Sequence, residues 1–466
     1  MISDFRGLIV TVVQAQPKSQ PKTEISGWGG FPRGQASIVC PANISEVSPP
    51  SNGTVIARGL GRSYGDAAIS TTGLVMLSEK LNRVASFDEK TGLLKAEAGT
   101  SLADILETFV PQGWFPPVVP GTKFVSLGGS VAADIHGKNH HHAGTFGRHV
   151  TGLQMIMANG NQVGCSPDRE AELFWATVGG MGLTGIITDV ELQLIPIETP
   201  YMVVQQTRAK DLDTSLSLLE DEQLDDEYTV AWIDCVAGRG LGRGILIRGH
   251  HAKRSDLPRR LKETNNSPKS RHLKLRFGFP PFALNRFTMA AFNETFYSWQ
   301  GRRIAPFIDT FDRFFFPLDR IQNWNRMYGR KGFVQYQCVL PLAESERGLQ
   351  KIMEELARSR RSSFLSVLKR FGPEGSGLLS FPMAGHTLTL DFPIRDEGLF
   401  PFLDRLDDIV LQHGGRVYLA KDARMRAETF QAMYPRLAEW QRVKSRVDPE
   451  NRFDSDLARR LRMNCS

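Results

Sequence analysis

Short apolar runs, each bounded by glycine, proline, asparagine or serine, recur through the first 200 residues of this 466-residue chain. Runs of this length and spacing predict strands. They lie at Thr54–Arg58, Leu74–Leu77, Val84–Phe87, Leu93–Glu97, Leu153–Ala158 and Val190–Leu194. Helical spacing predicts a helix at Leu102–Phe109, with Thr100 or Ser101 as its N-cap. We therefore expect one glycine-rich α+β unit here, preceded by a poorly ordered leader up to about Glu24.

The pattern changes after about Pro200, where charged helical segments and longer strands alternate. Helices are predicted at Leu212–Leu224 and Ala427–Val443. Strands are predicted around Trp232 and at Phe333–Leu340, Phe364–Leu368, Thr387–Asp391 and Arg416–Ala420. The C-terminal tail is compact and polar enough to dock back on the first unit.

Three loops rich in glycine interrupt the first unit: GLGRSYGD from Gly59, PGTKFVSLGGSVAADIHGKNHHHAGTFG from Pro120, and TVGGMGLTGII from Thr177. Gly59, Gly61 and Gly65 are spaced one residue too widely for the dinucleotide fingerprint, and no suitable helix follows, which argues against a nicotinamide-binding Rossmann fold. Glycines let the main chain approach a ligand closely, and exposed backbone N–H groups can bind a pyrophosphate. The loops suit a large planar cofactor. The alternative is a tight turn that leads into a buried helix.

The second loop also gathers histidines, at positions 136, 140, 141 and 142. Structural zinc sites use two separated pairs of Cys or His, and three consecutive imidazoles cannot all face one ion. The five cysteines show no short spacing, which argues against both a disulfide framework and a cysteine metal site and fits a reducing compartment. We expect no metal.

Charge and aromatic residues concentrate in one region of the second half. The net charge is +7, and nine Lys or Arg against two acids lie between Lys253 and Arg276. Such a run is either a solvated loop or a surface for anionic lipid or a phosphorylated substrate, and no motif for nucleic acid accompanies it. Thirteen of the forty residues from Phe277 to Phe316 are aromatic. They form either a phenylalanine-rich core or a flexible cover for an apolar substrate.

The only apolar run near the N-terminus, within Gly7–Val13, is too short for a signal peptide or a membrane span. We therefore expect a cytoplasmic protein, peripherally associated with an anionic membrane surface.

Taken in order, several blocks of the chain resemble a known family. The three glycine loops are similar to those of the flavin-binding domain of the vanillyl-alcohol oxidase and p-cresol methylhydroxylase family. Within it, further blocks resemble the flavoprotein subunits of the decaprenylphosphoryl-β-D-ribose 2′-epimerases: IHGKNHH, WNRMYGRKGFVQYQ, VLKRFGPEGSGLLSFPMAG, YLAKDAR and DPENRFDSDLARRL. The resemblance extends from Trp28 to Leu461 and is weakest over Lys253–Arg303.

The resemblance implies an α+β fold with two lobes. After the leader at 1–24, an FAD-binding domain would span 25–198 and be completed by 416–466. A substrate domain with an antiparallel sheet would be inserted at 199–415, and it would carry a mobile basic and aromatic segment at 253–316.

Carried over by position, the resemblance assigns FAD contacts to the first two glycine loops and to two later residues. These are Ala57, Arg58, Gly59, Leu60, Gly61, Arg62, Ser63, Tyr64, Gly65, Asp66, Ala67, Gly121, Ser126, Leu127, Gly128, Gly129, Ala133, Asp134, Ile135, His136, Ile187 and Tyr418. Many relatives bind flavin covalently through a histidine at the position of Arg62, and bicovalent relatives place a cysteine in the His140–His149 loop. This chain has neither, so we expect non-covalent FAD.

The implied reaction is FAD-dependent oxidation of the 2′-hydroxyl of a polyprenyl-phosphoryl-β-D-ribose to the 2′-keto sugar, by hydride transfer to flavin N5. This is the first half of epimerisation to the arabinose form, and a short-chain dehydrogenase partner would complete it. Such chemistry needs a cation beside the anionic reduced flavin. Lys421, in AKDAR, matches that cation, although a surface lysine paired with Asp422 is the alternative.

His136, Lys138, Tyr64 and Gln337 match the other catalytic-site positions. Gln337, on a predicted strand, would orient sugar hydroxyls. His136 would contact flavin or substrate, or is simply a core histidine.

One block departs from the family. Mycobacterial members read MAGWNVCVDF where this chain reads MAGHTLTLDF, from Met383 to Phe392. The tryptophan, the asparagine and the cysteine that reactive inhibitors modify become His386, Thr387 and Thr389. Hydride transfer needs no thiol, so these substitutions are compatible with catalysis. They leave open whether the sugar pocket and the lipid carrier are the same as in the mycobacterial members.

Two other functions remain open. The first is an FAD-dependent oxidase of a free alditol or aldonolactone. The second is a catalytically silent scaffold that binds a polyprenyl phosphate or a partner reductase.

Overall fold

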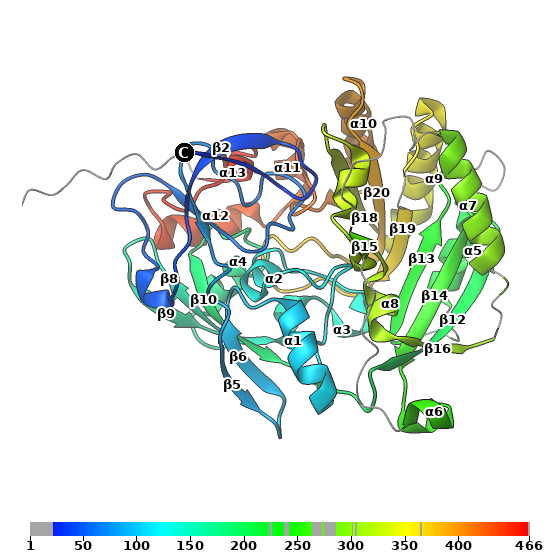
Figure 1. Cartoon of the computed structure of the whole chain (residues 1–466). Coiled ribbons are helices and arrows are strands. Elements are labelled where there is room, and N and C mark those ends of the chain that lie inside the picture. The colour runs from blue at the N-terminus through cyan, green and yellow to red at the C-terminus, as the bar shows by residue number, and fades with distance from the viewer. Residues whose placement is uncertain are drawn as a thin grey trace, which may run out of the picture.

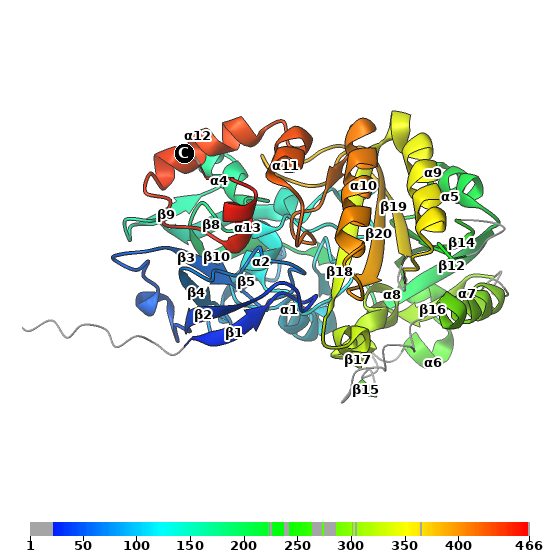
Figure 2. The same ribbon diagram turned by 90° about the horizontal axis from the view of Figure 1, so that it is seen from above.

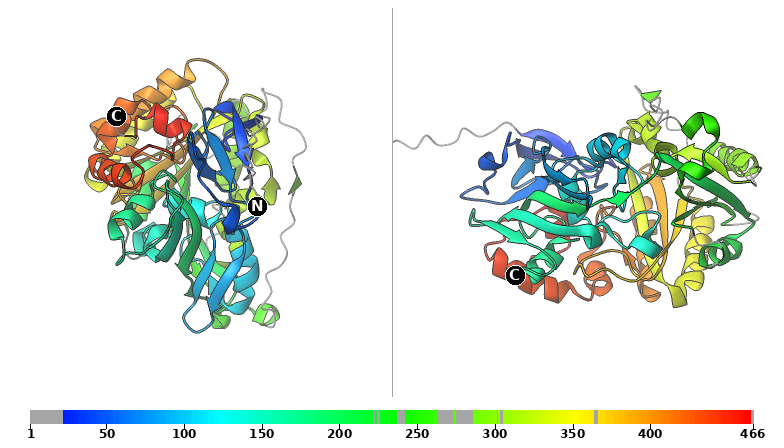
Figure 3. Two further views of the ribbon diagram at one scale, coloured as in Figure 1. Left: turned by 90° about the vertical axis from the view of Figure 1, so that its left-hand side faces the viewer. Right: turned by 90° about the horizontal axis from the view of Figure 1, so that it is seen from below.

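The structure is a computed structural model, and it describes residues 22–221, 223, 226–236, 242–262, 273–274, 286–300, 302, 305–363 and 366–464. These residues form two lobes that lie side by side (Figure 1). One lobe combines the N-terminal and C-terminal parts of the chain, and the other is built from the residues between them (Figure 3). The predicted two-lobed α+β organisation is confirmed.

Over the described residues, the first lobe contains a four-stranded sheet in the order β1-β2-β4-β3 and a five-stranded sheet in the order β5-β6-β10-β8-β9. The strands are β1 (Thr23–Ser26), β2 (Arg33–Val39), β3 (Val55–Arg58), β4 (Leu74–Leu77), β5 (Val84–Asp88), β6 (Leu93–Glu97), β8 (Val150–Ile156), β9 (Gln162–Cys165) and β10 (Ile186–Gln193). A further short pair joins β7 (Trp114–Phe115) to β11 (Ile195–Pro196).

The helices of this lobe are α1 (Leu102–Phe109), α2 (Leu127–Ala132), α3 (His140–Ala143) and α4 (Ala171–Thr177). The prediction for α1 is confirmed, including its cap: the Ser101 hydroxyl accepts a hydrogen bond from the Asp104 N–H, at 3.1 Å. The cap satisfies one of the backbone donors that the first helical turn leaves without a partner.

Strand β1 corrects the predicted leader at 1–24. Thr23 and Glu24 pair with Ala36 and Gln35 of β2, and Ile25 is buried. Pairing on one edge and burial of one apolar side chain order this segment, while residues 1–21 lie outside the described residues.

The second lobe is organised around a sheet of eight described strands, in the order β16-β12-β14-β13-β19-β20-β18-β21, with antiparallel neighbours throughout. The strands are β12 (Tyr201–Ala209), β13 (Tyr228–Ile233), β14 (Gly244–His251), β16 (Phe307–Thr310), β18 (Phe333–Pro341), β19 (Ser366–Phe371), β20 (Gly385–Pro393) and β21 (Arg416–Val417). Because β21 pairs with β18, the sheet continues two residues past the predicted boundary at 415.

Helices cover the two faces of this sheet unequally. Helices α5 (Leu212–Glu220), α9 (Leu342–Ser359) and α10 (Leu399–Gln412) lie along one face, and α7 (Arg286–Gln300) lies on the other (Figure 2). Smaller elements are α6 (Arg259–Lys262), α8 (Phe311–Phe315) and the parallel pair β15 (Leu273–Lys274) with β17 (Ile321–Gln322). Side chains alternate along a strand, so one set packs under the three helices and the other faces the first lobe.

The basic and aromatic segment predicted at 253–316 has several parts. Phe277, Phe279 and Phe282 lie outside the described residues. At its C-terminal end, β16 pairs with β12, and Phe311, Phe314, Phe315 and Phe316 are buried in the core. For these four residues a phenylalanine-rich core is therefore correct, and a mobile cover is wrong, because the sheet edge and the packed rings order them.

The C-terminal part returns to the first lobe as α11 (Ala427–Met433), α12 (Leu437–Val447) and α13 (Asp456–Arg460). The single predicted helix Ala427–Val443 is wrong. Pro435 separates α11 from α12, because proline lacks the N–H that a helix interior requires. Docking on the first lobe includes a hydrogen bond of 2.7 Å from the Val55 N–H to the Arg452 carbonyl. Among the helices described, none is long and apolar enough to cross a bilayer.

Candidate active site

A cavity of about 620 Å³ lies between the glycine loops and the open face of the eight-stranded sheet. Its size is typical of a site for a cofactor or small molecule. Most of the predicted FAD contacts line it: Ala57, Gly59, Leu60, Gly61, Arg62, Ser63, Tyr64, Ala67, Gly121, Ser126, Gly128, Gly129, Ala133, Ile135, His136, Ile187 and Tyr418. The structure thus brings together segments as far apart in the chain as Ala57 and Tyr418, which are 361 positions apart.

The first and second loops meet at Gly59. A Cβ there would collide with the Ser126 hydroxyl, which is itself the N-cap of α2 and accepts a hydrogen bond from the Gly129 N–H at 3.3 Å. Gly61 has φ +64, a left-handed conformation that favours glycine. At these positions the cavity wall is formed by backbone rather than by side chains. Because backbone N–H groups can bind a pyrophosphate, the two loops fit a cofactor that contains one.

Five predicted FAD contacts do not line the cavity: Arg58, Gly65, Asp66, Leu127 and Asp134. They support the wall from behind. Arg58 donates to the Ser26 carbonyl at 2.8 Å, and the Asp66 carboxylate pairs with Arg460 at 2.8 Å. Sequence position could not separate these supporting residues from their neighbours on the cavity side.

Tyr418, in the turn after β21, connects the C-terminal part to the second loop. Its hydroxyl donates to the Ala133 carbonyl at 2.7 Å, and its N–H donates to the Gln337 carbonyl at 2.9 Å. The turn that follows is therefore held against both lobes, and it carries Lys421.

Lys421 lines the cavity, with its Nζ 3.9 Å from the centroid of the Tyr64 ring. Burial lowers the pKa of Lys421 to about 7, against the attraction of Asp391, and the charge of Lys369 adds to the lowering. A lysine that titrates near neutrality inside a cleft is a candidate functional group.

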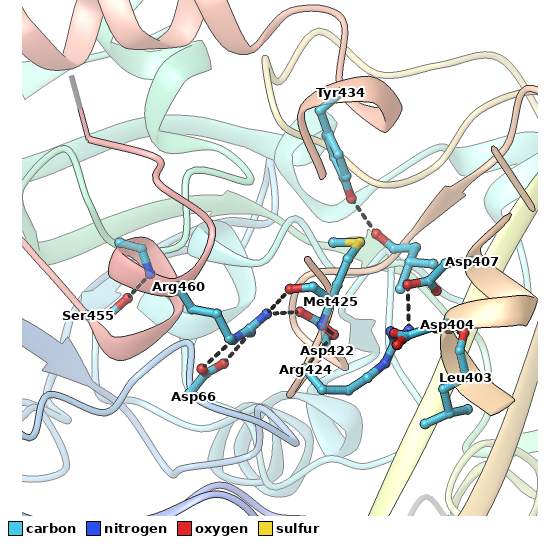
Figure 4. Close-up of polar contacts among 12 residues, drawn as sticks. Asp66, Leu403, Asp404, Asp407, Asp422, Arg424, Met425, Tyr434, Ser455 and Arg460 are labelled. Atoms are coloured by element: carbon cyan, nitrogen blue, oxygen red, sulfur yellow. Dashed lines mark hydrogen bonds and ion pairs between the residues drawn. The ribbon is translucent and has the colours of Figure 1, made fainter. Parts of the chain in front are cut away.

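Asp422 is not the partner of Lys421. Arg460 of α13 pairs with Asp422 at 2.9 Å and with Asp66 of the first loop at 2.8 Å (Figure 4). The backbone N–H groups of Arg424 and Met425 also donate to the Asp422 carboxylate, at 3.0 and 2.9 Å. These groups, rather than Lys421, satisfy Asp422, and the Lys421 side chain lines the cavity.

His136 and Gln337 meet across the two lobes. The Nε2 atoms of the two side chains lie 2.9 Å apart, and the Gln337 amide also donates to the Thr387 hydroxyl at 3.1 Å. Burial holds the pKa of His136 well below its usual range, so the ring is neutral at neutral pH. Among the described residues, its Nδ1 has no hydrogen-bond partner, which leaves one polar ring atom for a ligand.

Lys138 is anchored by its neighbours. Its ammonium donates to the Phe314 carbonyl and lies 4.2 Å from the centroid of the Phe314 ring. Burial, reinforced by the charge of Lys369, lowers the pKa of Lys138 to about 7.

Lys369, on β19, also lines the cavity, and sequence reasoning missed it. Burial lowers its pKa to about 8. It stands in the VLKRFG block that carries the resemblance, two positions after Val367 on the same sheet face, so strand periodicity would have placed it there.

Thr389 of β20 lines the cavity and is the register partner of Gln337 on β18 and of Val367 on β19. His386 is buried on the opposite side, where its Nε2 lies 3.7 Å from Glu220 of α5. Of the three departures in this block, Thr387 and Thr389 therefore bear on the cavity and His386 bears on helix packing.

In the part of the chain that the structure describes, no group of three or more His, Cys, Asp or Glu side chains is arranged to hold a metal ion. The histidines of the second loop are instead dispersed: the ring of His140 accepts a hydrogen bond from the Gly372 N–H at 3.1 Å, and His141 contacts the Asp226 carbonyl at 3.2 Å.

Comparison with known proteins agrees with this geometry. An FAD binding domain family matches residues 41–166. The decaprenylphosphoryl-β-D-ribose oxidase of Mycolicibacterium smegmatis is 40% identical over 450 residues, which cover 94% of this chain and 97% of that protein. The chain belongs to the decaprenylphosphoryl-β-D-ribose oxidase family. It is an FAD-dependent oxidoreductase.

More distant similarities concern parts of the chain. A D-arabinono-1,4-lactone oxidase family matches residues 391–461. The L-gulonolactone oxidase of Scyliorhinus torazame is 28% identical over 185 residues, which cover 40% of this chain and 41% of that protein. An uncharacterized protein of Streptomyces coelicolor is 36% identical over 371 residues, 78% of this chain and 99% of that protein.

Proposed function

We propose that this enzyme oxidises the 2′-hydroxyl of a polyprenyl-phosphoryl-β-D-ribose to the 2′-keto sugar. The observation that carries this proposal is the composition of the cavity. Lys421, His136 and Gln337 lie at one part of it, and Trp232, Phe292 and Phe296 line another. A substrate with a polar sugar and an apolar chain matches both parts, and the relative of known name acts on such a molecule.

When bound, FAD supplies the acceptor for the hydride that leaves the sugar C–H bond. Lys421 supplies a positive charge in the cavity, which stabilises negative charge that develops during the reaction. Gln337 and the neutral His136 bind and orient sugar hydroxyls from the two lobes. Lys138 and Lys369 add positive charge that suits the phosphate of the substrate. The glycine loops hold the cofactor without a covalent bond, because Arg62 replaces the linking histidine.

A second candidate is oxidation of a free alditol or aldonolactone. The match of residues 391–461 to a lactone oxidase family favours it. The aromatic wall of the cavity argues against it, since a small polar sugar leaves that surface without a partner.

Action on a polyprenyl phosphate implies work at a membrane surface, because the chain is too apolar to leave the bilayer. Lys253, Arg254, Arg259, Arg260 and Lys262 are exposed around α6 and would attract anionic headgroups. A short-chain dehydrogenase partner would then reduce the keto sugar to the arabinose form. This completes an epimerisation in which the two half-reactions move hydride in opposite directions.

The test is anaerobic bleaching of the flavin absorbance. Polyprenyl-phosphoryl-ribose should bleach it within seconds to minutes, and xylitol or a γ-lactone at the same concentration should not. Bleaching by the free sugar derivatives alone would replace this proposal with the second candidate.

A further inference from the structure

A row of side chains crosses the sheet on the cavity face. In the register of the sheet, Gln337 on β18 pairs with Thr389 on β20, and Thr389 pairs with Val367 on β19. Val367 in turn pairs with Trp232 on β13. All four line the cavity. The row passes from an amide through a hydroxyl to two apolar side chains, so polarity falls steadily with distance from the His136 side.

Strand spacing sets the length of this row. Neighbouring strands lie about 4.8 Å apart, so three steps place Trp232 about 14 Å from Gln337. A ribose with its phosphate is shorter than this distance. A molecule that presents its sugar hydroxyls to Gln337 would therefore have its apolar part at Trp232.

Helix α7 continues the apolar surface beyond the sheet. The ring of Phe296 lies 4.8 Å from that of Trp232, and the ring of Phe292 stacks on Phe296 at 6.1 Å. Phe292 and Phe296 both line the cavity, yet Phe292 is 48% exposed. Three rings thus connect the interior of the cavity to the protein surface.

Polar contacts fix α7 on the sheet. Asn293 donates to the Asp234 carboxylate at 2.7 Å, Glu294 pairs with Arg243 at 2.9 Å, and Tyr297 donates to the Ala209 carbonyl at 3.3 Å. The exposure of Phe292 therefore belongs to an anchored helix. Phe292 thus carries the apolar lining of the cavity to the outer surface of the protein.

We propose that Trp232, Phe296 and Phe292 form the binding track for the first isoprene units of the substrate chain, leading them from the cavity to the outer surface of α7. This inference rests on the proposed function. Flat apolar rings suit a branched hydrocarbon, and the track is continuous with the polar site that would hold the sugar. Phe287 and Trp299, at 86% and 58% exposure, lie near the two ends of the same helix and do not line the cavity.

The experiment compares two soluble substrates, farnesyl-phosphoryl-β-D-ribose with three isoprene units and dimethylallyl-phosphoryl-β-D-ribose with one. The measured quantity is the ratio of their kcat/KM values for flavin reduction. In the holoenzyme the longer chain should be favoured by about tenfold or more, since each buried methylene contributes to binding. Phe292→Ser should bring the ratio close to one, mainly through the KM of the longer substrate.

Phe287→Ser is the matched control, because it removes a more exposed phenylalanine of the same helix and should keep the ratio. Melting temperatures of both variants check that the fold is retained. If the ratio of kcat/KM values is unchanged in Phe292→Ser, or falls equally in Phe292→Ser and Phe287→Ser, the proposed binding track is wrong.

A second measurement separates the track from the proposed function. Farnesyl phosphate, which has no sugar, should bind the holoenzyme in calorimetry, and Phe292→Ser should weaken its Kd by about tenfold while Phe287→Ser does not. If neither ribose substrate reduces the flavin, the proposed function fails, and this measurement still decides the track. Equal Kd values in all three proteins would refute it.

Discussion

Three lysines, at positions 138, 369 and 421, share one cavity, and burial lowers the pKa of each toward neutrality. The largely apolar cavity wall makes the charged form of each lysine less favourable than it is in water. An anionic cofactor or substrate reverses this preference. The cluster is thus suited to bind negative charge, and Lys421, with its Nζ 3.9 Å from the centroid of the Tyr64 ring, is the member that the C-terminal turn contributes.

Lys421→Met should slow flavin reduction by roughly tenfold or more while FAD stays bound, since a charge-assisted contact contributes about 1.5–3 kcal/mol. Stopped-flow absorbance under anaerobic conditions measures the rate. A variant that reduces its flavin at the wild-type rate would remove Lys421 from the site.

The pH dependence tests the same residue. The cation exists below its pKa of about 7, so kcat/KM for reduction should fall as pH rises through that value. The fall should be smaller in Lys421→Met, where Lys138, Lys369 and Asp391 remain as the groups that titrate in this range. Arg426→Met, which removes a surface cation paired with Asp408, is the control that should keep the wild-type profile.

Thr389 should make this enzyme resistant to inhibitors that require a thiol at this position. A threonine hydroxyl has a pKa far above neutrality and forms no adduct without an activating base. Intact-mass spectrometry should show modification of Thr389→Cys and none of the wild type. An adduct on residue 389 of the wild type would contradict the assignment.

At the scale of elements, α13 acts as a clamp. Arg460 joins it to the first glycine loop through Asp66 and to the turn of Lys421 through Asp422 (Figure 4). The network continues through Arg424, which pairs with Asp407 of α10 at 2.6 Å. Helices from both lobes thus position the segment that carries the cavity cation.

Arg460→Met should lower the free energy of unfolding by about 3–5 kcal/mol, because it leaves two buried carboxylates without their cation. Arg462→Met is the matched control: its pair with Glu428 is more than two-thirds exposed on both sides, and such pairs contribute at most about 1 kcal/mol. Urea denaturation of both variants provides the comparison. Equal losses would show that Arg460 is no clamp.

At the scale of the whole molecule, the cavity that would hold the cofactor lies where the two lobes and the C-terminal turn converge, and we expect the fold rather than a covalent bond to retain FAD there. Acid precipitation should release yellow FAD into the supernatant. Flavin that remains with the denatured pellet would disprove non-covalent binding.

The exposed cations around α6 should bind anionic liposomes in a salt-sensitive way, because screening shortens the Debye length to about 8 Å at physiological ionic strength and further above it. Co-sedimentation should fall with added salt and fall again when Arg259, Arg260 and Lys262 become Ser. If binding does not depend on salt, or if no binding occurs, the cations around α6 do not form a membrane-binding surface.

Local pattern alone determined much of this protein. Strand and helix periodicity predicted α1 and six strands of the first lobe, β3, β4, β5, β6, β8 and β10, because each of these elements is specified by its own side chains. The glycine loops alone indicated a large planar cofactor, because glycines let the main chain approach a ligand closely, and FAD itself followed from the resemblance to the family.

Only the tertiary structure decided the rest, because it depends on contacts between residues far apart in the chain. It separated Gly59 at the cavity from Asp66 behind it, and it assigned Asp422 to Arg460 rather than to Lys421. It also placed Lys369 in the site and Phe311 in the core. The residues near a position in the sequence determine its secondary structure and so the face on which its side chain lies. The packing of the two lobes determines which residues that side chain contacts.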